Sequence, residues 1–228
     1  MSGEGRACET ALLLAAGARL RYSQETTARA VVFFYRLLPS FGEGDADLLA
    51  ATCLFLAGKA AETPRRVRDV VNASQRSRDA GAAVAPLDDG YFQRKAAVID
   101  AEQRALRLLG FDLEAATPHR LALTLAHALR CDGGAAQVAL ALANDSLFSA
   151  TCRALPPVAV AAAAVDVALE VEGAGAARDR DRDDPQSRLG NGRRRDARWH
   201  ARFGASDADV AAARGALLDE LDRALPPP

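Results

Sequence analysis

The sequence predicts an all-α protein. Apolar residues recur every three to four positions along most of the chain, which is the period of one helix face. Runs of alternating β-branched residues, which mark strands, are almost absent. Proline and glycine interrupt the pattern at intervals that suit short helices joined by loops. With 228 residues, the chain is long enough for one large domain or two small ones.

The first half of the chain is expected to hold five helices, over residues 10–18, 23–38, 47–61, 64–74 and 90–109. The segment 47–61 is apolar nearly all round, which is typical of a helix at the centre of a domain. Asp45 or Asp47 can cap its start. Thr63 is expected to cap the following helix, with Pro64 in the first helical position.

Other helix ends in this half are also marked by residue type. Ser23 is a plausible N-cap, with Thr26 or Thr27 as alternative starts. Pro39 is expected to stop that helix, because proline cannot continue the hydrogen-bond ladder. Gly110 is expected to end the long helix before it, as glycine tolerates the backbone turn that closes a helix.

The chain is expected to divide into an N-terminal extension (1–22), a first five-helix fold (23–114) and a second fold (115–228). The second fold is predicted to contain helices at about 118–129, 135–151, 157–172 and 206–224. Residues 173–198 mix both charges and hold almost no apolar side chains, so they are expected to form a disordered insert or a solvated loop.

The charge and cysteine content exclude several classes. The net charge of −1 predicts no broad attraction to nucleic acid or to a membrane. The four cysteines are scattered without a CxxC pair, which favours buried free thiols in a reducing compartment over a zinc site. No segment is long enough to span a bilayer, and the acidic residues before TALLLAAGA argue against a secretion signal.

Two charged residues stand among apolar neighbours. Lys59 ends the central helix, and Glu102 has Val98, Ile99 and Leu106 three and four positions away. A carboxylate on a buried stripe needs a partner, and the two charges can meet at the surface of the bundle. One interpretation is a structural ion pair at the rim. The other is a polar grip on a partner's backbone, held on a rigid apolar surface.

These residues carry a resemblance to a known family. LLAATCLFLAGKAAETPRRVRDVVN resembles the cyclin box, especially that of the transcriptional cyclins. DAEQRALRLLGFDL resembles the cyclin-box helix that ends in a Leu-x-Phe-x-Leu-type signature, and PHRLALTLAHAL resembles the start of a second cyclin fold. The similarity runs from about residue 20 to 172 and resumes at Trp199. RDVVNASQR, TPHRL and PPVAVAAAAVDVALEV are most similar to cyclin-Q, the activator of cyclin-dependent kinase ten.

The resemblance implies a tandem of two five-helix cyclin folds. It also implies a regulatory subunit that activates a cyclin-dependent kinase, one like cyclin-dependent kinase ten. In cyclins, the residues that match Lys59 and Glu102 bond the kinase αC helix and help turn it inward. The resemblance places Leu56, Leu106 and Phe111 in the apolar bed beneath that helix. It implies no enzymatic activity, no cofactor, no metal site and no small-molecule substrate.

One departure from the family pattern follows Lys59. Transcriptional cyclins usually carry two glutamates after the lysine and one spacer. Here Ala61 stands in place of the first glutamate, which leaves Glu62 as the remaining candidate for a kinase contact. The resemblance implies a nuclear or cytoplasmic protein that is not secreted.

The residues leave two other functions to consider. A cyclin-fold transcription adaptor that binds DNA or polymerase needs a basic face, for which Arg65, Arg66, Arg68 and 193–195 are candidates; acidic neighbours dilute both groups. An enzyme is disfavoured because the sequence has no glycine-rich phosphate loop, no GxSxG and no HExxH.

Overall fold

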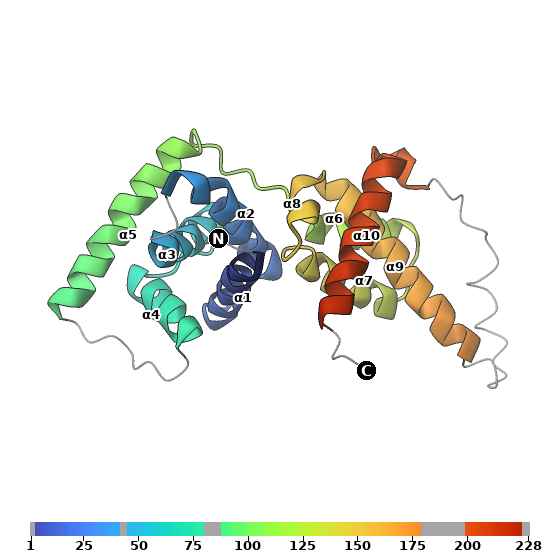
Figure 1. Ribbon diagram of the computed structural model, residues 1–228, viewed down its shortest axis with the longest axis horizontal. Helices are drawn as coiled ribbons and strands as arrows, with labels where there is room; N and C mark the ends of the chain where they lie inside the picture. Colours follow the sequence, from blue (N-terminus) through green and yellow to red (C-terminus); the bar gives the residue numbers. More distant parts are fainter. Residues whose placement is uncertain (1–2, 42–44, 80–87, 179–198, 225–228) are drawn as a thin grey trace. The chain divides into compact units, whose positions relative to one another are not determined.

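The computed structural model describes residues 3–41, 45–79, 88–178 and 199–224, and within these ranges all regular structure is helical. The contacts divide the chain into two compact units, Met1–Thr117 and Pro118–Pro228. Each unit contains five of the described α-helices (Figure 1). The predicted all-α fold is therefore confirmed. No described helix combines the length and the apolar character needed to cross a membrane.

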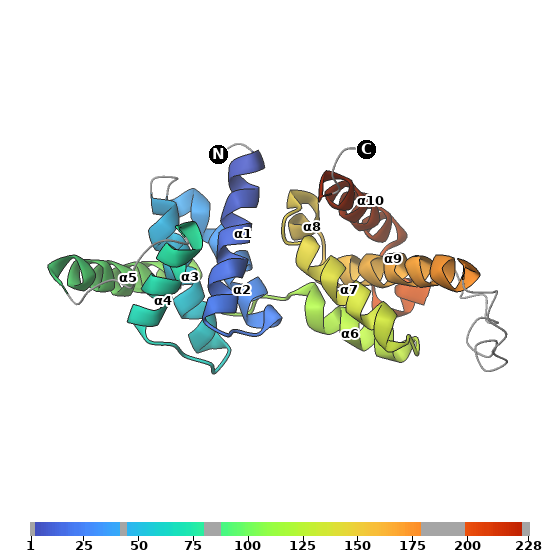
Figure 2. The same cartoon turned by 90° about the horizontal axis from the view of Figure 1, so that it is seen from below.

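The first unit is built around a central helix. Its helices are α1 (Gly3–Arg19), α2 (Gln24–Phe41), α3 (Ala46–Ala60), α4 (Val67–Arg78) and α5 (Asp89–Leu108). Every residue of α3 from Leu49 to Gly58 is buried, as its all-round apolar sequence predicts. The other four helices pack around α3, and α1 also lies along α4 (Figure 2). The segment expected as an N-terminal extension thus packs inside the first unit.

Two predicted helix ends in this unit are confirmed, and a third is confirmed in its position only. The Ser23 hydroxyl accepts a hydrogen bond from the Thr26 N–H at 3.1 Å, so α2 begins directly after Ser23. Asp45 occupies the N-cap position of α3, although its side chain caps no backbone N–H. Gly110 follows α5 with a φ of +62°, the left-handed conformation that glycine adopts easily.

Two predicted ends are wrong. Pro39 does not stop α2, which continues to Phe41; that side chain is 7% exposed, so its burial offsets the hydrogen bond that proline cannot make. Thr63 and Pro64 do not begin α4, which starts at Val67. The Thr63 N–H instead donates to the Gly58 carbonyl at 2.9 Å and closes the end of α3.

The second unit has the same plan, with an alanine-rich helix at its centre. Its helices are α6 (Pro118–Ala128), α7 (Gly133–Asp145), α8 (Ala150–Ala154), α9 (Pro157–Arg178) and α10 (Asp207–Ala224), with a 3₁₀ turn, η3, at Trp199–Phe203. Helix α9 packs against α6, α7 and α10. The Trp199 indole N–H donates to Asp166 Oδ1 at 2.8 Å and ties η3 to α9.

Two expectations in this unit need correction. The single helix expected over 135–151 is two helices, because the chain turns after Asp145 and Ser149 caps α8 through the Cys152 N–H at 3.3 Å. Helix α9 extends to Arg178, into the segment expected as an insert, since the stretch GAGAAR is rich in alanine, the best helix former. The remainder of that segment, 179–198, lies outside the described residues.

Candidate functional site

The end of α3 positions Lys59 and Glu62. The Glu62 N–H donates to the Lys59 carbonyl at 3.1 Å, and the Thr63 N–H donates to Gly58, a pair of bonds that closes a helix tightly. This closure requires a left-handed residue, and Glu62 supplies it with a φ of +57°. Glu62 is exposed, so its carboxylate is available to a partner.

The end of α5 positions Leu106 and Phe111 in the same manner. The Phe111 N–H donates to the Leu106 carbonyl at 2.9 Å, and the Gly110 N–H donates to Arg107 at 3.1 Å. In this motif the two outer residues often make an apolar contact across the helix end. Phe111 is 68% exposed and Leu106 is half-buried, so the helix end offers apolar surface to solvent.

Lys59 and Glu102 meet across α3 and α5. Lys59 Nζ donates to both oxygens of Glu102, at 2.7 Å to Oε1 and 2.9 Å to Oε2. The same ammonium lies 4.2 Å from the centre of the Phe55 ring, within the range of a cation–π contact. The Lys59 side chain is 45% exposed and that of Glu102 is 11% exposed. The pair is therefore formed, and its cationic end reaches solvent.

This geometry leaves hydrogen-bonding capacity free for a partner. A lysine ammonium carries three N–H donors, and Glu102 takes two of them. The third can donate to a carbonyl oxygen of another chain. Because the pair is half in solvent, we expect it to contribute only about 0–1 kcal/mol to the stability of the chain itself.

Apolar side chains surround the pair on α5. Phe92, Ile99 and Leu106 recur every seven positions and share one side of the helix. Phe92 is 56% exposed and Ile99 is 37% exposed. Ile99 was expected on the buried stripe, and its exposure corrects that expectation. We call the surface formed by Lys59, Ile99, Glu102, Leu106 and Phe111 the platform.

Leu56 lies differently from the other candidates. It was expected in the apolar bed for a partner helix, but it is 1% exposed, so it belongs to the core and offers no surface of its own. Phe92 and Ile99 were not among the candidate residues. Their place in a seven-residue repeat that ends at Leu106 is the available signal, but the same repeat also describes a buried face.

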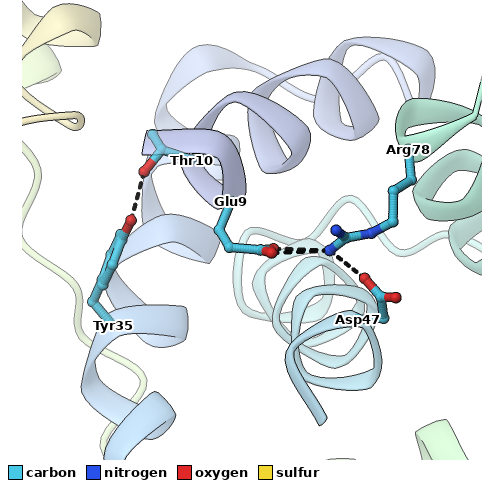
Figure 3. A network of polar contacts seen from close by, with 5 residues as sticks. All are labelled: Glu9, Thr10, Tyr35, Asp47 and Arg78. Carbon is cyan, nitrogen blue, oxygen red and sulfur yellow. Dashed lines mark hydrogen bonds and ion pairs between the residues drawn. The ribbon is translucent and has the colours of Figure 1, made fainter. Parts of the chain in front are cut away.

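A second polar network holds α1 in place (Figure 3). Arg78 Nη2 donates to both oxygens of Glu9 at 3.0 Å and also pairs with Asp47, and Thr10 Oγ1 lies 2.8 Å from the Tyr35 hydroxyl. Burial acts to lower the pKa of the Arg78 guanidinium, but the hydrogen bond to Glu9 and the charges of Glu9 and Asp47 outweigh it and raise that pKa. The network therefore fastens α1 to α2, α3 and α4.

Arg78 and Asp47 also border a mainly apolar hollow of about 580 Å³ between α1, α3, α4 and α5. Among the residues whose positions are described, no three His, Cys, Asp or Glu side chains gather as metal ligands would. The platform combines the predicted charged residues Lys59 and Glu102 with exposed apolar surface.

The chain is similar to known cyclins in sequence. The family model for the cyclin N-terminal domain matches residues 1–114, a range that includes α1. Human cyclin-L1 is 36% identical over 148 residues, which cover 61% of this chain and 28% of that protein. Cyclin-T1-5 of Arabidopsis thaliana is 33% identical over 151 residues, 62% of this chain and 26% of that protein. The match thus spans little more than a quarter of these relatives' length.

Solved structures with a similar fold cover nearly the whole chain. A chain of the yeast RNA polymerase II C-terminal-domain kinase complex CTDK-1 aligns with a TM-score of 0.73 and 21% identity, over 95% of this chain and 65% of that one. A chain of the Chaetomium thermophilum CAK complex bound to ATP-gamma-S aligns with a TM-score of 0.60 and 18% identity, over 96% and 63%. Each unit therefore has a five-helix cyclin fold, and the chain belongs to the cyclin family.

Proposed function

We propose that this chain is the regulatory subunit of a cyclin-dependent serine/threonine kinase, which it binds and activates by positioning the kinase αC helix. The observation that carries the proposal is the Lys59–Glu102 pair, formed at 2.7 Å and open to solvent at its lysine end. Exposed apolar side chains flank it on α5. A few polar contacts within an apolar surface are the usual composition of a tight interface.

The mechanism follows from the geometry of the platform. The apolar face of the kinase helix would lie on Ile99, Leu106 and Phe111, and the free N–H of Lys59 would donate to a carbonyl of its backbone. A partner that binds only the inward position of this helix shifts the kinase population toward that position. Inward placement lets the helix glutamate pair with the β3 lysine that holds the ATP phosphates. The chain itself would supply no catalytic group.

Three observations support a particular kind of kinase as the partner. The relatives include cyclins L and T, and one similar structure is a chain of a kinase complex that acts on the RNA polymerase II C-terminal domain. RDVVNASQR and TPHRL resemble cyclin-Q. We therefore propose a transcription-type kinase, with one like cyclin-dependent kinase ten as the first to test, and a nuclear location.

A charge swap tests the proposal. Lys59→Glu or Glu102→Lys alone places two like charges together, and each is expected to lower both stability and binding. The double variant restores an internal pair of opposite polarity, so its helicity and melting temperature should stay close to those of the parent chain. Its platform presents the wrong charge to the kinase, so co-purification with co-expressed cyclin-dependent kinase ten should be lost.

A matched swap controls for the number of changes. Arg214 Nη2 and Glu170 Oε2 form a similar pair between α10 and α9 of the second unit, at 2.6 Å. Exchanging these two residues should leave co-purification intact. If the Lys59/Glu102 double variant binds the kinase as the parent chain does, the proposed role of the platform is wrong. Testing the kinases that pair with cyclins L and T alongside separates a wrong partner from a wrong surface.

A further inference from the structure

A cluster of arginines lines a hollow on the first unit that plays no part in the proposed kinase contact. The hollow measures about 660 Å³ and lies where the end of α1 meets α4 and the segment before it. It is lined by Arg19, Leu20, Arg21, Arg65, Asp69, Asn72, Ala73 and Arg76. The residues that line it thus include four arginines and one carboxylate, that of Asp69. We call this feature the arginine hollow.

The arginines are not neutralised by the protein. Among the described residues, no ion pair joins Arg19, Arg21, Arg65 or Arg76 to a carboxylate. Arg65 is held in place instead, because its Nε donates to the Leu20 carbonyl at 2.9 Å and its guanidinium lies 5.5 Å from the centre of the Tyr22 ring. Arginines gathered at this density repel each other unless an anion joins them.

Arg76 supplies the second observation. Its Nε is buried and has no hydrogen-bond partner in the part of the chain that the structure covers. A buried donor without an acceptor costs free energy, and such exceptions call for an explanation. Because this Nε is closed off from solvent, an anion in the hollow can reach it only if the Arg76 side chain turns toward the hollow. The anion would then supply the missing acceptor and offset the repulsion among the arginines.

We propose that the arginine hollow binds a phosphate monoester carried on a peptide, that is, a phosphorylated serine or threonine of a partner protein. Guanidinium groups form paired hydrogen bonds with phosphate oxygens, and a dianionic ester suits several arginines around one point. A strand of nucleic acid fits less well. Among the described residues that line the hollow none is aromatic, so none offers a ring for a base to stack on. The net charge of −1 also predicts no broad attraction to nucleic acid.

Fluorescence anisotropy on the full chain tests this proposal. The probes are a labelled degenerate peptide pool with a central phosphothreonine, the same pool without phosphate, and a short single-stranded RNA. We expect the phosphorylated pool to bind at least about tenfold more tightly than the unphosphorylated one. Arg76→Ala and Arg21→Ala should each weaken that binding by about tenfold. Free inorganic phosphate should compete with the phosphorylated pool.

Two further variants keep the result interpretable. Arg68→Ala removes an arginine of α4 that does not line the hollow, so its affinity should stay within about twofold of the parent. Arg76→Lys keeps the charge but loses the paired geometry, so it should bind more weakly than the parent although it folds. Equal binding of both peptide pools, tighter binding of RNA, or an equal loss in Arg68→Ala would overturn the proposal. Kinase co-purification should be unchanged in Arg76→Ala, which separates this site from the platform.

Discussion

At the scale of single residues, three helices end with a side chain in a conformation that usually belongs to glycine. Arg21, Glu62 and Arg130 have φ angles of 55°, 57° and 53°. In each case the left-handed residue and its successor donate back to carbonyls of the last helical turn. The sequence could not predict these three closures, because the usual signal is a glycine and none of the three helices carries one at that position.

Replacing Glu62 by glycine separates backbone strain from partner binding. Glycine removes a left-handed penalty of roughly 1–2 kcal/mol, of which part is lost to its greater freedom in the unfolded chain. We therefore expect Glu62→Gly to raise the free energy of unfolding by about 0.5–1 kcal/mol in chemical denaturation. If Glu62 contacts the kinase, co-purification should weaken at the same time. Arg130→Gly is the control and should gain similar stability with unchanged binding. Equal binding by both variants would remove Glu62 from the interface.

Cysteine reactivity is a second property of single residues. All four thiols were expected to be buried, but Cys8 is exposed and Cys131 is half-buried, while Cys53 and Cys152 are buried. Burial raises the pKa of both the Cys53 and the Cys152 thiols, which leaves little reactive thiolate at neutral pH. In the native protein a thiol reagent should therefore modify Cys8 first, and Cys53 and Cys152 only after unfolding. Mass spectrometry over time checks the order; rapid native labelling of Cys53 would contradict its placement.

The candidate site was predictable in part from its residues. The proximity of Lys59 and Glu102 followed from two charges on apolar helices that each needed a partner, and the structure brings them to 2.7 Å. The burial of Leu56 did not follow. On a helix that is apolar all round, the sequence shows no face, so which side chains reach the surface depends on how the other helices pack.

At the scale of elements, one error arose where two helices share a connection. Thr63 followed by Pro64 has the composition of a helix start, but the Thr63 N–H already closes α3. Arg65 lies in the segment between α3 and α4, and its Nε donates to the Leu20 carbonyl. This bond holds the segment in an extended conformation before α4 begins. A capping rule considers one helix at a time, so the sequence placed the start of α4 too early.

The packing of α1 on α2 gives a prediction of the same scale. A Cβ atom added at Gly17 would lie 2.4 Å from Thr27 Oγ1, and Thr27 is buried with its hydroxyl bonded to the Ser23 carbonyl at 3.1 Å. Gly17→Ala should therefore force the helices apart and lower the free energy of unfolding by about 1–3 kcal/mol. Gly215→Ala in α10 meets nothing within 4 Å and should raise it by about 0.5–1 kcal/mol. Urea denaturation measures both, and a neutral Gly17→Ala would contradict the close packing of these helices.

At the scale of the whole molecule, the fold class was readable because helical periodicity is a local property of the chain. Each unit has one helix buried on nearly all sides: α3 in the first and α9 in the second. In α3 large apolar residues predict this burial, whereas the buried residues of α9 are mainly alanine and valine. The grouping of the helices into two units depends on contacts between distant segments, which periodicity does not report.

Because the two units have separate cores, a cavity-creating mutation in one core should destabilise that unit and leave the other folded. Leu217 is fully buried in the core of the second unit, so Leu217→Ala should cost about 2–5 kcal/mol there. In hydrogen exchange measured by mass spectrometry, amides of α7, α9 and α10 should lose protection while those of α1 to α5 keep it. Leu54→Ala, at an equally buried position of α3, should give the reverse pattern. Because the platform lies wholly on α3, α5 and the turn after α5, Leu217→Ala should also retain kinase binding, and Leu54→Ala should weaken it. Loss of protection across both units in either variant would show that the chain unfolds as one cooperative body.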